Sequence, residues 1–210
     1  MGKPPLGGRV KTRLSQDIGV GPAAMFYRQS AARVLRRLGG DSRWHLKLAV
    51  NAAPTEHYDC WPRHLKRISQ GTGSLGERMA FAMAQAPKGP VVVIGTDSPQ
   101  VEPGQIAAAF KALGQHEAVF GPANDGGYWL IGINRRRPSP YLFSNVRWST
   151  EHALADTVDS LPPTFSVGHL DTIIDVDTGD DLRALRSAHG PLRLGPWVMA
   201  TGPSSSSSGP

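Results

Sequence analysis

The sequence contains one cysteine, no long apolar run and no paired histidines, and each shortage excludes a class of protein. Cys60 alone forms neither an intrachain disulfide nor a zinc cluster, so a reducing, cytoplasmic location is expected. No run of about 18 apolar residues occurs, which argues against a membrane span. The first eight residues lack the apolar segment of a secretory signal. A hydrolase is also disfavoured, because neither a His-x-x-x-His spacing nor a Gly-x-Ser-x-Gly turn occurs.

Acidic residues are outnumbered, since 17 aspartates and glutamates stand against 23 lysines and arginines, for a formal net charge of +6. This balance favours acidic partners, which include nucleotides, nucleic acids and anionic membrane surfaces. Apart from residues 36–37 and 135–137, the basic residues are scattered. Solvated surface charge accounts for most of them, and no nucleic-acid-binding motif accompanies either cluster. Nucleic acid is therefore not expected as a partner.

The chain has the pattern of an α/β protein. With 210 residues, 40% of them apolar, it is long enough for one substantial domain, expected over residues 1–192. Residues 193–210, rich in glycine, proline and serine, are expected to form a disordered tail. Four consecutive β-branched residues at 91–94 indicate a strand buried on both faces, as in the middle of a parallel sheet.

Helices and short strands alternate along the rest of the chain. The predicted helices cover residues 22–38, 74–86, 103–113, 150–161 and 178–189, and the other predicted strands cover residues 44–50, 117–120, 128–133, 164–167 and 171–177. Met25, Leu35 and Leu38 are expected on the inner side of the first helix, and Ser74 and Glu77 have the spacing of a capping box. Because this alternation is typical of βαβ units, we predict a single α/β sandwich with a mainly parallel sheet.

Carboxylates follow several of the predicted strands. Asp97 comes directly after residues 91–94, Asp125 lies between two strands, and Asp175 and Asp177 end another strand. In open α/β sheets ligands bind beyond the carboxyl ends of the strands, so these side chains are placed to meet. Carboxylates from separate strands can share one hard cation, and Mg²⁺ typically takes one or two of them together with substrate phosphates.

A loop rich in glycine and proline at residues 3–13 carries three cations, Arg9, Lys11 and Arg13. Adjacent glycines allow close backbone approach to a ligand, and the cations would balance phosphate charge. Together with the carboxylates, the loop suits transfer chemistry on a nucleotide, in which positioning and charge neutralisation do most of the catalysis. A basic N-terminal segment without a function explains the loop equally well.

Each acidic residue also has a purely structural explanation. Asp97 fits the cap of a turn, and Asp125 fits a plain hairpin turn because Asp-Gly is the strongest signal for one. Asp177 fits helix capping beside Thr178. Asp180 and Asp181, in the first turn of the last helix, are better explained as partners of the helix dipole than as ligands. On these residues alone the alternatives stay open.

Six motifs occur together in the order typical of one bacterial family. They are GGRVKTRL (7–14), GSLGERM (73–79), VIGTDSP (93–99), FGPANDGGYWLIGI (120–133), RWST (147–150) and DVDTGDDL (175–182). On these motifs the chain resembles, over roughly residues 7–190, the DUF2064 family of glycosyltransferase-like proteins, which are related to phospholactate guanylyltransferase and molybdenum cofactor guanylyltransferase. The resemblance implies a Rossmann-like, three-layer sandwich of the GT-A nucleotide-diphospho-sugar transferase type, with Mg²⁺ or Mn²⁺ as the cofactor.

The resemblance also implies a role for each motif. The implied nucleotide-binding residues are Gly8, Arg9, Lys11, Thr12, Arg13 and Arg78, although a solvated helix position explains Arg78 equally well. The implied metal ligands are Asp97, Asp175 and Asp177, and here Thr-Asp-Ser stands in place of Asp-x-Asp. The implied catalytic residues are Asp97 and Asp125. The implied acceptor side consists of Gly126, Gly127, Tyr128, Trp129 and Trp148.

One departure from the family concerns the first strand. Relatives begin with a hydrophobic strand before the 7–14 motif, whereas residues 1–6 read MGKPPL here. The strand is thus missing or truncated, and we expect either a start codon placed too late or a decayed copy with a damaged nucleotide site.

Three functions follow from the resemblance. The first is a metal-dependent transferase that uses a nucleotide-sugar donor and a small-molecule acceptor. The alternative is a nucleotidyltransferase, guanylyltransferase-like, that acts on a phosphorylated small molecule. The third is an inactive, N-terminally truncated relative that only binds nucleotide.

Overall fold

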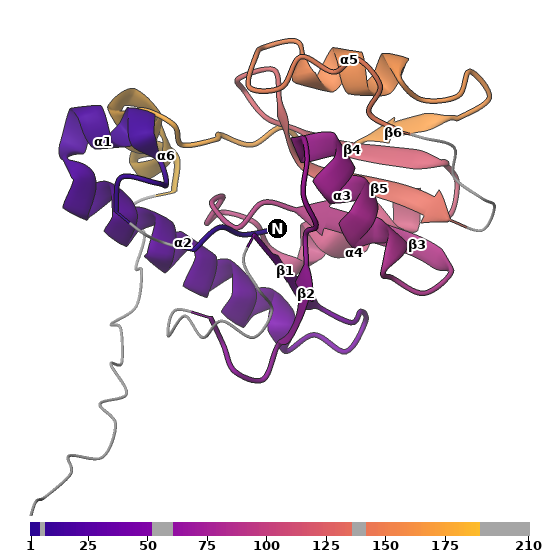
Figure 1. Cartoon of the computed structure of the whole chain (residues 1–210), viewed down its shortest axis with the longest axis horizontal. Coiled ribbons are helices and arrows are strands. Elements are labelled where there is room, and N and C mark those ends of the chain that lie inside the picture. The colour runs from indigo at the N-terminus through magenta and orange to yellow at the C-terminus, as the bar shows by residue number, and fades with distance from the viewer. Residues whose placement is uncertain (5–6, 52–60, 136–141, 190–210) are drawn as a thin grey trace, which may run out of the picture.

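The computed structural model describes residues 1–4, 7–51, 61–135 and 142–189. The helices are α1 (Thr12–Ile18), α2 (Val20–Gly39), α3 (Leu75–Ala84), α4 (Pro103–Ala112), α5 (Ala153–Asp159) and α6 (Gly179–His189). The strands are β1 (Lys47–Val50), β2 (Lys66–Ser69), β3 (Gly89–Ile94), β4 (Ala118–Pro122), β5 (Tyr128–Arg135) and β6 (Val167–His169) (Figure 1). Cys60 and the predicted tail at 193–210 lie outside the described residues. None of the described helices is long and apolar enough to cross a membrane.

The strands form two sheets. The larger sheet has the order β3-β5-β4-β6, in which β5 is antiparallel to β3 and β4, and β4 is parallel to β6. The smaller sheet is the parallel pair β1-β2. The larger sheet is therefore mixed, and the prediction of a mainly parallel sheet is wrong. The reason lies in the turn at residues 123–127, which returns the chain directly from β4 into β5 as a hairpin does, without a crossover helix.

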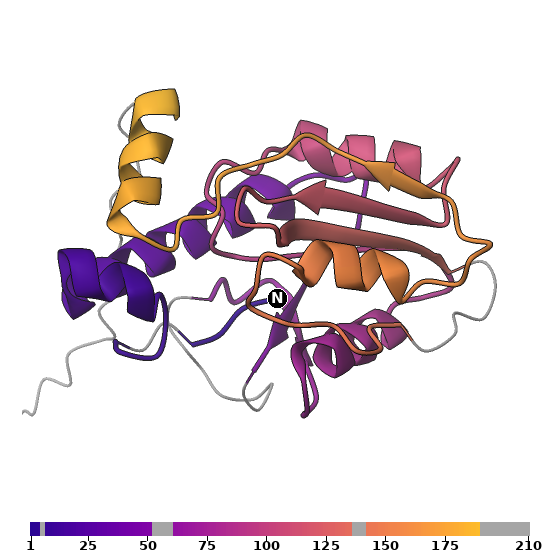
Figure 2. The ribbon, with the colours of Figure 1, turned by 90° about the horizontal axis from the view of Figure 1, so that it is seen from above.

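Helices cover both faces of the larger sheet (Figure 2). On one face α2 and α4 contribute to a core that includes Val34, Leu38, Ile106, Ala109, Leu113, Val119 and Leu130. On the other face α3 and α5 pack on a core that includes Met79, Met83, Phe120, Ile131 and Ile133, with Leu154 and Val158 against it. The predicted α/β class is confirmed, because strands and helices alternate along the chain and the helices bury the sheet.

The apolar run at residues 91–94 lies in β3, as predicted, but β3 is an edge strand of the larger sheet and not a central one. Val91 and Val93 pack against the core under α3, while Val92 and Ile94 pack against the core under α4. All four residues are half-buried. The unbroken run therefore reflects helices on both faces of the strand and does not report its place in the sheet.

Met1 and Gly2 lie between β1 and β3, where the resemblance implies a first strand. The backbone N–H of Gly2 donates to the carbonyl of Ala49 at 3.0 Å, and the ammonium of Met1 donates to the carbonyl of Ile94. The side-chain amide of Gln70 donates to the carbonyls of Gly2 and Ala49 at 3.0 and 2.9 Å. These contacts join the smaller sheet to the C-terminal end of β3.

Two of the predicted helices are confirmed in detail. Pro22 lies in the first turn of α2, and Gly39 ends it. At the start of α3 the Ser74 hydroxyl accepts from the Glu77 N–H at 3.2 Å, and the Ser74 N–H donates to the Glu77 carboxylate at 2.8 Å, so the capping box is present. Both signals are local, which is why the sequence reveals them.

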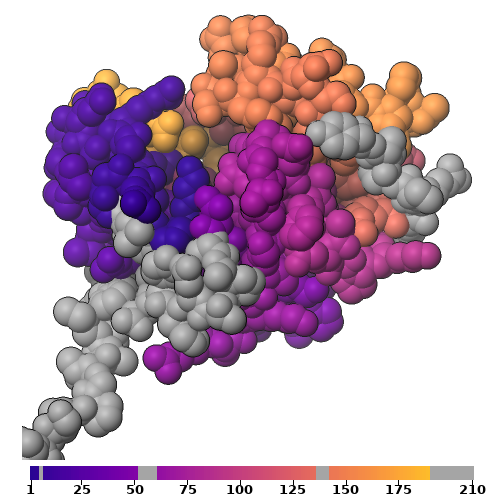
Figure 3. All heavy atoms as spheres, in the orientation of Figure 1, coloured from indigo at the N-terminus to yellow at the C-terminus, as the bar shows by residue number. Residues whose placement is uncertain are grey.

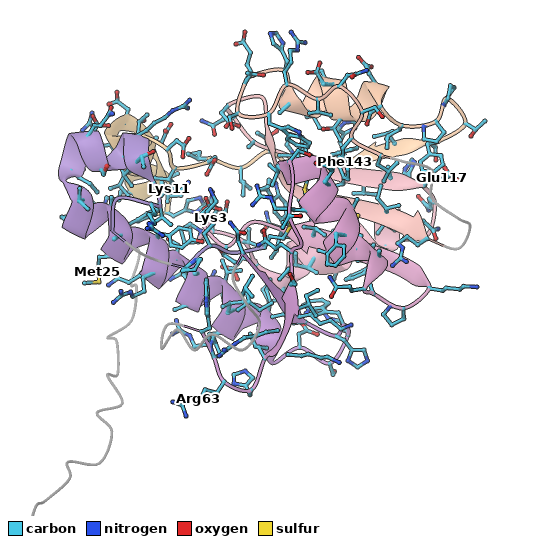
Figure 4. All side chains as sticks on the ribbon, viewed as in Figure 1. Lys3, Lys11, Met25, Arg63, Glu117 and Phe143 are labelled. Carbon is cyan, nitrogen blue, oxygen red and sulfur yellow. The ribbon has the colours of Figure 1, made fainter. Side chains whose placement is uncertain are left out.

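Several local predictions are wrong or incomplete. Met25 is 49% exposed and points away from the protein on the outer side of α2, because the buried face of α2 follows Ala23, Phe26 and Val34 instead (Figure 4). Residues 171–177 form no strand and make one isolated bridge, between Ala123 and Ile173. Helix α1 and strand β2 were not predicted. Helix α1 packs against α2 and α6 through Leu14, which places the 7–14 motif beside the C-terminal part of the described chain.

Candidate functional site

A cleft of about 790 Å³ opens at the C-terminal end of β3, between the N-terminal segment and the segment before α5 (Figure 3). The predicted site residues that line it are Arg9, Lys11, Thr12, Arg13, Arg78, Asp97, Asp125, Gly127, Tyr128, Trp129, Trp148, Asp175 and Asp177. Gly8 and Gly126 are predicted site residues outside the lining. Segments far apart in the sequence thus meet at one cavity, and its volume is in the range of small-molecule sites.

The ammonium of Lys11 lies at the centre of the acidic wall, and the Lys11 side chain is only 4% exposed. Its Nζ atom lies 2.9 Å from Asp97 Oδ2, 3.2 Å from Asp175 Oδ1 and 3.1 Å from Asp177 Oδ1. Lys11 lies next to α1 (Figure 4). It has a left-handed backbone, at a φ of 47°, which is uncommon for a residue with a side chain. The lysine predicted to contact phosphate therefore contacts all three predicted metal ligands.

Backbone hydrogen bonds position two of these carboxylates. The N–H of Asp175 donates to Asn124 Oδ1 at 2.8 Å. The N–H of Asp177 donates to Asp181 Oδ2 at 3.1 Å, and the same oxygen accepts from the N–H of Thr178 at 2.8 Å. Capping at the start of α6 is therefore carried out by Asp181 and Thr178, which leaves the carboxylate of Asp177 to contact Lys11.

The charged groups shift one another's pKa values. Burial by itself would lower the pKa of Lys11, but the three carboxylates raise it above the ordinary value. Burial opposes ionisation of Asp97 too, yet the ammonium of Lys11 holds the pKa of Asp97 below the usual value. Burial raises the pKa of Asp175 to about 6, a shift that Lys11 partly offsets and the two other carboxylates reinforce. The ammonium of Met1 also lowers the pKa of Asp97, so Lys11 is the central but not the sole cation that acts on these carboxylates.

The donor set fits a divalent cation, since three carboxylates supply the hard oxygen ligands that Mg²⁺ and Mn²⁺ prefer. The spacing is that of an ammonium site, because the three oxygens lie 2.9–3.2 Å from the lysine nitrogen whereas Mg²⁺ takes ligands at about 2.0–2.1 Å. As the side chains stand, no three His, Cys, Asp or Glu residues in the described part of the chain are spaced to hold a metal ion. Chemistry and charge therefore suit the implied cofactor, and the geometry is set by Lys11.

Three arginines of the predicted nucleotide site also line the cleft. Arg9 is exposed, and Arg13, 66% exposed, lies 3.6 Å from Asp177 through Nη1. Arg78 is half-buried, with Nε 3.4 Å from the Ser74 carbonyl. A guanidinium group can donate two parallel hydrogen bonds to two oxygens of one phosphate, so this rim suits an anion with several oxygens. Gly8 is exposed outside this rim.

Asp125 belongs to a separate, exposed turn. Its Oδ1 atom accepts from the N–H of Gly127 at 2.9 Å. Gly126 has a φ of 81°, and a Cβ there would lie 2.1 Å from the carbonyl oxygen of Glu151, so the position requires glycine. The turn thereby packs directly on the segment before α5. Asp125 contributes to turn geometry, as the structural explanation predicted, and it is also one of the residues that line the cleft.

The three predicted aromatic residues differ in exposure. Trp129 is 4% exposed and belongs to the core. Tyr128 packs edge-on against Phe120 with a centroid distance of 5.4 Å, and its hydroxyl lies 3.3 Å from Thr157 Oγ1. Trp148 is half-buried and lies over Phe143, at 5.9 Å between centroids. Tyr128 is half-buried as well, so both Tyr128 and Trp148 leave part of their ring surface accessible, whereas Trp129 does not.

The sequence analysis did not identify the residues whose hydrogen bonds position the site residues. Asn124 and Asp181 position the backbones of two ligand candidates, and both lie inside motifs that were recognised for their neighbours. Tyr27 OH lies 3.2 Å from Thr96 Oγ1 and accepts from the N–H of Lys3 at 2.9 Å, directly beside Asp97. No sequence signal separates Tyr27 from any other buried residue of α2.

Known proteins show the same α/β fold. The crystal structure of a protein from Desulfovibrio desulfuricans G20, which carries a provisional name as a nucleotide-diphospho-sugar transferase, is 33% identical in sequence. The match covers 91% of this chain and 87% of that chain, with a TM-score of 0.78. The chain therefore shares its α/β fold with that protein over nearly the whole of both chains.

Residues 34–150 match the family described as "Uncharacterized protein conserved in bacteria (DUF2064)". The chain belongs to this family, and the predicted resemblance is confirmed. No protein of curated function is detectably similar in sequence.

Two crystal structures of Rv0371c from Mycobacterium tuberculosis H37Rv are more distantly similar. One matches at 18% identity over 76% of this chain and 83% of that chain, with a TM-score of 0.49. The other, a manganese complex, matches at 19% identity over 77% and 86%, with a TM-score of 0.44. At this distance neither bears on the site of the present chain.

Proposed function

We propose that the protein is a metal-dependent transferase with a nucleotide-sugar donor, built on a Rossmann-like, three-layer fold of the GT-A type. The observation that carries the proposal is a single cleft with three carboxylates around Lys11 on one wall and arginines at its rim. Similarity to the 33%-identical protein that carries a provisional name as a nucleotide-diphospho-sugar transferase supports the same conclusion. A diphosphate brings negative charge that both a divalent cation and the arginines would neutralise.

On the donor side, Asp97, Asp175 and Asp177 would hold Mg²⁺ or Mn²⁺. The ion would supply Lewis-acid stabilisation of the leaving diphosphate. Arg9, Lys11, Thr12, Arg13 and Arg78 would bind and orient the phosphates, with Gly8 allowing the loop its turn. Because the phosphates would be held from several elements, the bond to the sugar would be fixed in one orientation.

On the acceptor side, the β4–β5 turn and Trp148 would form the opposite wall. Gly126 and Gly127 keep the turn narrow, Tyr128 and Trp129 support it from the core, and Trp148 offers a flat apolar surface for a sugar or other acceptor. Asp125 Oδ1 is engaged by Gly127, so we assign Oδ2 as the atom that accepts the proton of the acceptor hydroxyl.

Nucleotidyl transfer is the second candidate, favoured by the number of cations in the cleft. Arg9, Lys11, Arg13 and Arg78 together would suit a triphosphate, whose charge exceeds that of a diphosphate-sugar. In that reaction pyrophosphate leaves, whereas glycosyl transfer releases a nucleoside diphosphate. An inactive nucleotide-binding relative is the third candidate.

A thermal-shift screen followed by product analysis tests the proposal. Nucleotides and nucleotide-sugars are screened with Mg²⁺ or Mn²⁺, and a true ligand at a hundredfold excess over its dissociation constant raises stability by about 2.7 kcal/mol. Metal-dependent release of nucleoside diphosphate in the presence of acceptors supports glycosyl transfer, and release of pyrophosphate supports nucleotidyl transfer. Binding without either product, in chains with and without any upstream in-frame extension, would leave the inactive relative as the function.

A further inference from the structure

The ammonium of Lys11 occupies the one point that all three acidic ligand candidates share. Its Nζ atom lies within 3.2 Å of one oxygen from each of Asp97, Asp175 and Asp177, and its side chain is only 4% exposed. The buried ammonium of Lys11, with three carboxylate partners, thus occupies the position that a divalent metal ion would take between the same carboxylates. The site as it stands is therefore filled from within the chain.

A divalent ion and this ammonium exclude each other. Metal ligation draws oxygens to about 2.1 Å, and two like charges around the same three oxygens repel strongly in a site of low dielectric. Entry of the ion thus requires Lys11 to leave. The side chain of lysine has four rotatable carbons and a compact charge, so it can be redirected without a change of backbone.

Phosphate bound in the cleft would supply a second position for the displaced ammonium. Lys11 lines the cleft together with Arg9 and Arg13, which flank it in sequence and reach the same cavity. Among those arginines an ammonium is repelled unless an anion such as phosphate lies between them. Phosphate in the cleft would therefore favour the outward position, and an outward Lys11 would leave the carboxylates free for the ion.

We propose that Lys11 is an exchangeable internal cation, which fills the carboxylate site in the absence of metal and moves out to the substrate phosphates when a divalent ion enters. The inference rests on the proposed function, since it takes the three carboxylates as the metal site. It adds a coupling: metal and phosphate each favour the binding of the other, because both favour the same position of Lys11. By linkage the two effects are equal in size.

Amine labelling of the unmodified protein tests the movement directly. Acetylation of each lysine by an amine-reactive reagent is followed by mass spectrometry with and without Mn²⁺, and Mn²⁺ binding is measured in parallel from the signal of the free ion. We expect Lys11 to be protected without metal and to become several-fold more reactive when Mn²⁺ is bound. Lys3, which lines the same cleft but is exposed, is the internal control and should not change.

A matched pair of variants tests the competition. Lys11→Met should bind Mn²⁺ roughly tenfold or more tightly than the unmodified protein, within the usual range for coupled sites. Lys3→Met removes the same charge from the same cleft without touching the carboxylates, so its Mn²⁺ affinity should change far less. If Lys11→Met folds only when Mn²⁺ is added, that result supports exchange as well, because the ion then replaces the missing ammonium.

The outcomes separate this inference from the proposed function. Mn²⁺ that binds equally well to the unmodified protein and to Lys11→Met, with Lys11 protected throughout, overturns the exchange and leaves the metal site in place. Mn²⁺ that binds to neither protein overturns both the exchange and the metal-dependent function.

Discussion

Asp97 and Asp125 are alike in sequence and differ in the structure. Asp97 follows β3, and Asp125 lies between β4 and β5. Both lie in turns with small residues, and both line the cleft. Asp97 is paired with a buried ammonium at 2.9 Å, whereas Asp125 is exposed and hydrogen-bonds its own turn. The difference teaches that a carboxylate acquires its role from distant segments, in this case from the loop before α1.

The largest expected effect comes from Asp97→Ala. Loss of one of three candidate ligands should reduce metal-dependent turnover roughly a thousandfold or more, comparable to other losses of electrostatic stabilisation in active sites. Stability should fall as well, by about 1–3 kcal/mol, because Lys11 loses its shortest ion pair. Steady-state kinetics and urea unfolding measure the two effects. The control is Asp159→Ala, at an exposed position of α5 away from the cleft lining.

Asp125→Asn should show whether the turns that carry Asp97 and Asp125 have separate functions. It keeps the shape of the side chain and its hydrogen bond to Gly127, but it removes the proton acceptor, so turnover should fall roughly a hundredfold or more. Mn²⁺ affinity should not change, because Asp125 makes no contact with Lys11 in the described structure. A weakened Mn²⁺ affinity in titration would show that the turns form one site, and the comparison above would be wrong.

Gly126→Ala should test the structural role of the turn that contains Asp125. The new Cβ would clash with the Glu151 carbonyl at 2.1 Å in a backbone conformation that disfavours side chains. We expect a loss of about 2 kcal/mol or more in the free energy of unfolding. Urea unfolding measures it, and Gly104→Ala, where no atom lies within 4 Å of the new Cβ, is the control. Equal stability of the two variants would mean that the β4–β5 turn is not held against residue 151.

The smallest effect concerns Asp156, a carboxylate of α5 outside the cleft lining. The guanidinium and the backbone N–H of Arg147 both donate to the Asp156 carboxylate. These hydrogen bonds hold the pKa of Asp156 well below the usual value. The folded pKa is depressed, so the pair stabilises the fold above the unfolded pKa of about 3.9 and the gain is lost as pH falls through the folded pKa. Asp156→Asn should therefore be less stable than the unmodified protein at pH 7 and approach it at acid pH. A difference in unfolding midpoint that does not depend on pH would refute the ion-pair explanation.

Local signals in the sequence predicted much of the fold. The capping box of α3, the glycine at the end of α2 and the apolar run of β3 each depend on neighbouring residues, and each was confirmed. Sheet order was not predictable in this way. The same run of valines suits a central strand or an edge strand with helices on both faces, and only long-range packing decides between them.

Most of the residues predicted for the site line one cleft, but their arrangement within it was not predicted. Asp97, Asp175 and Asp177 were expected to share a metal and Lys11 to contact phosphates, whereas the structure brings all four together. Helix α1 was missed because it has no side-chain cap and begins from a left-handed lysine.

The bond between Lys11 and Asp175 spans 164 positions of the chain, which has a consequence for biosynthesis. Lys11 and Asp97 are synthesised before Asp175 and Asp177, which emerge only after five of the described helices and all the described strands. Contacts between such distant parts form late, since the loop between them must first be closed. Asp97 is therefore the first carboxylate available to Lys11, and the acidic group gains its other two members only after residues 175–177 have been synthesised.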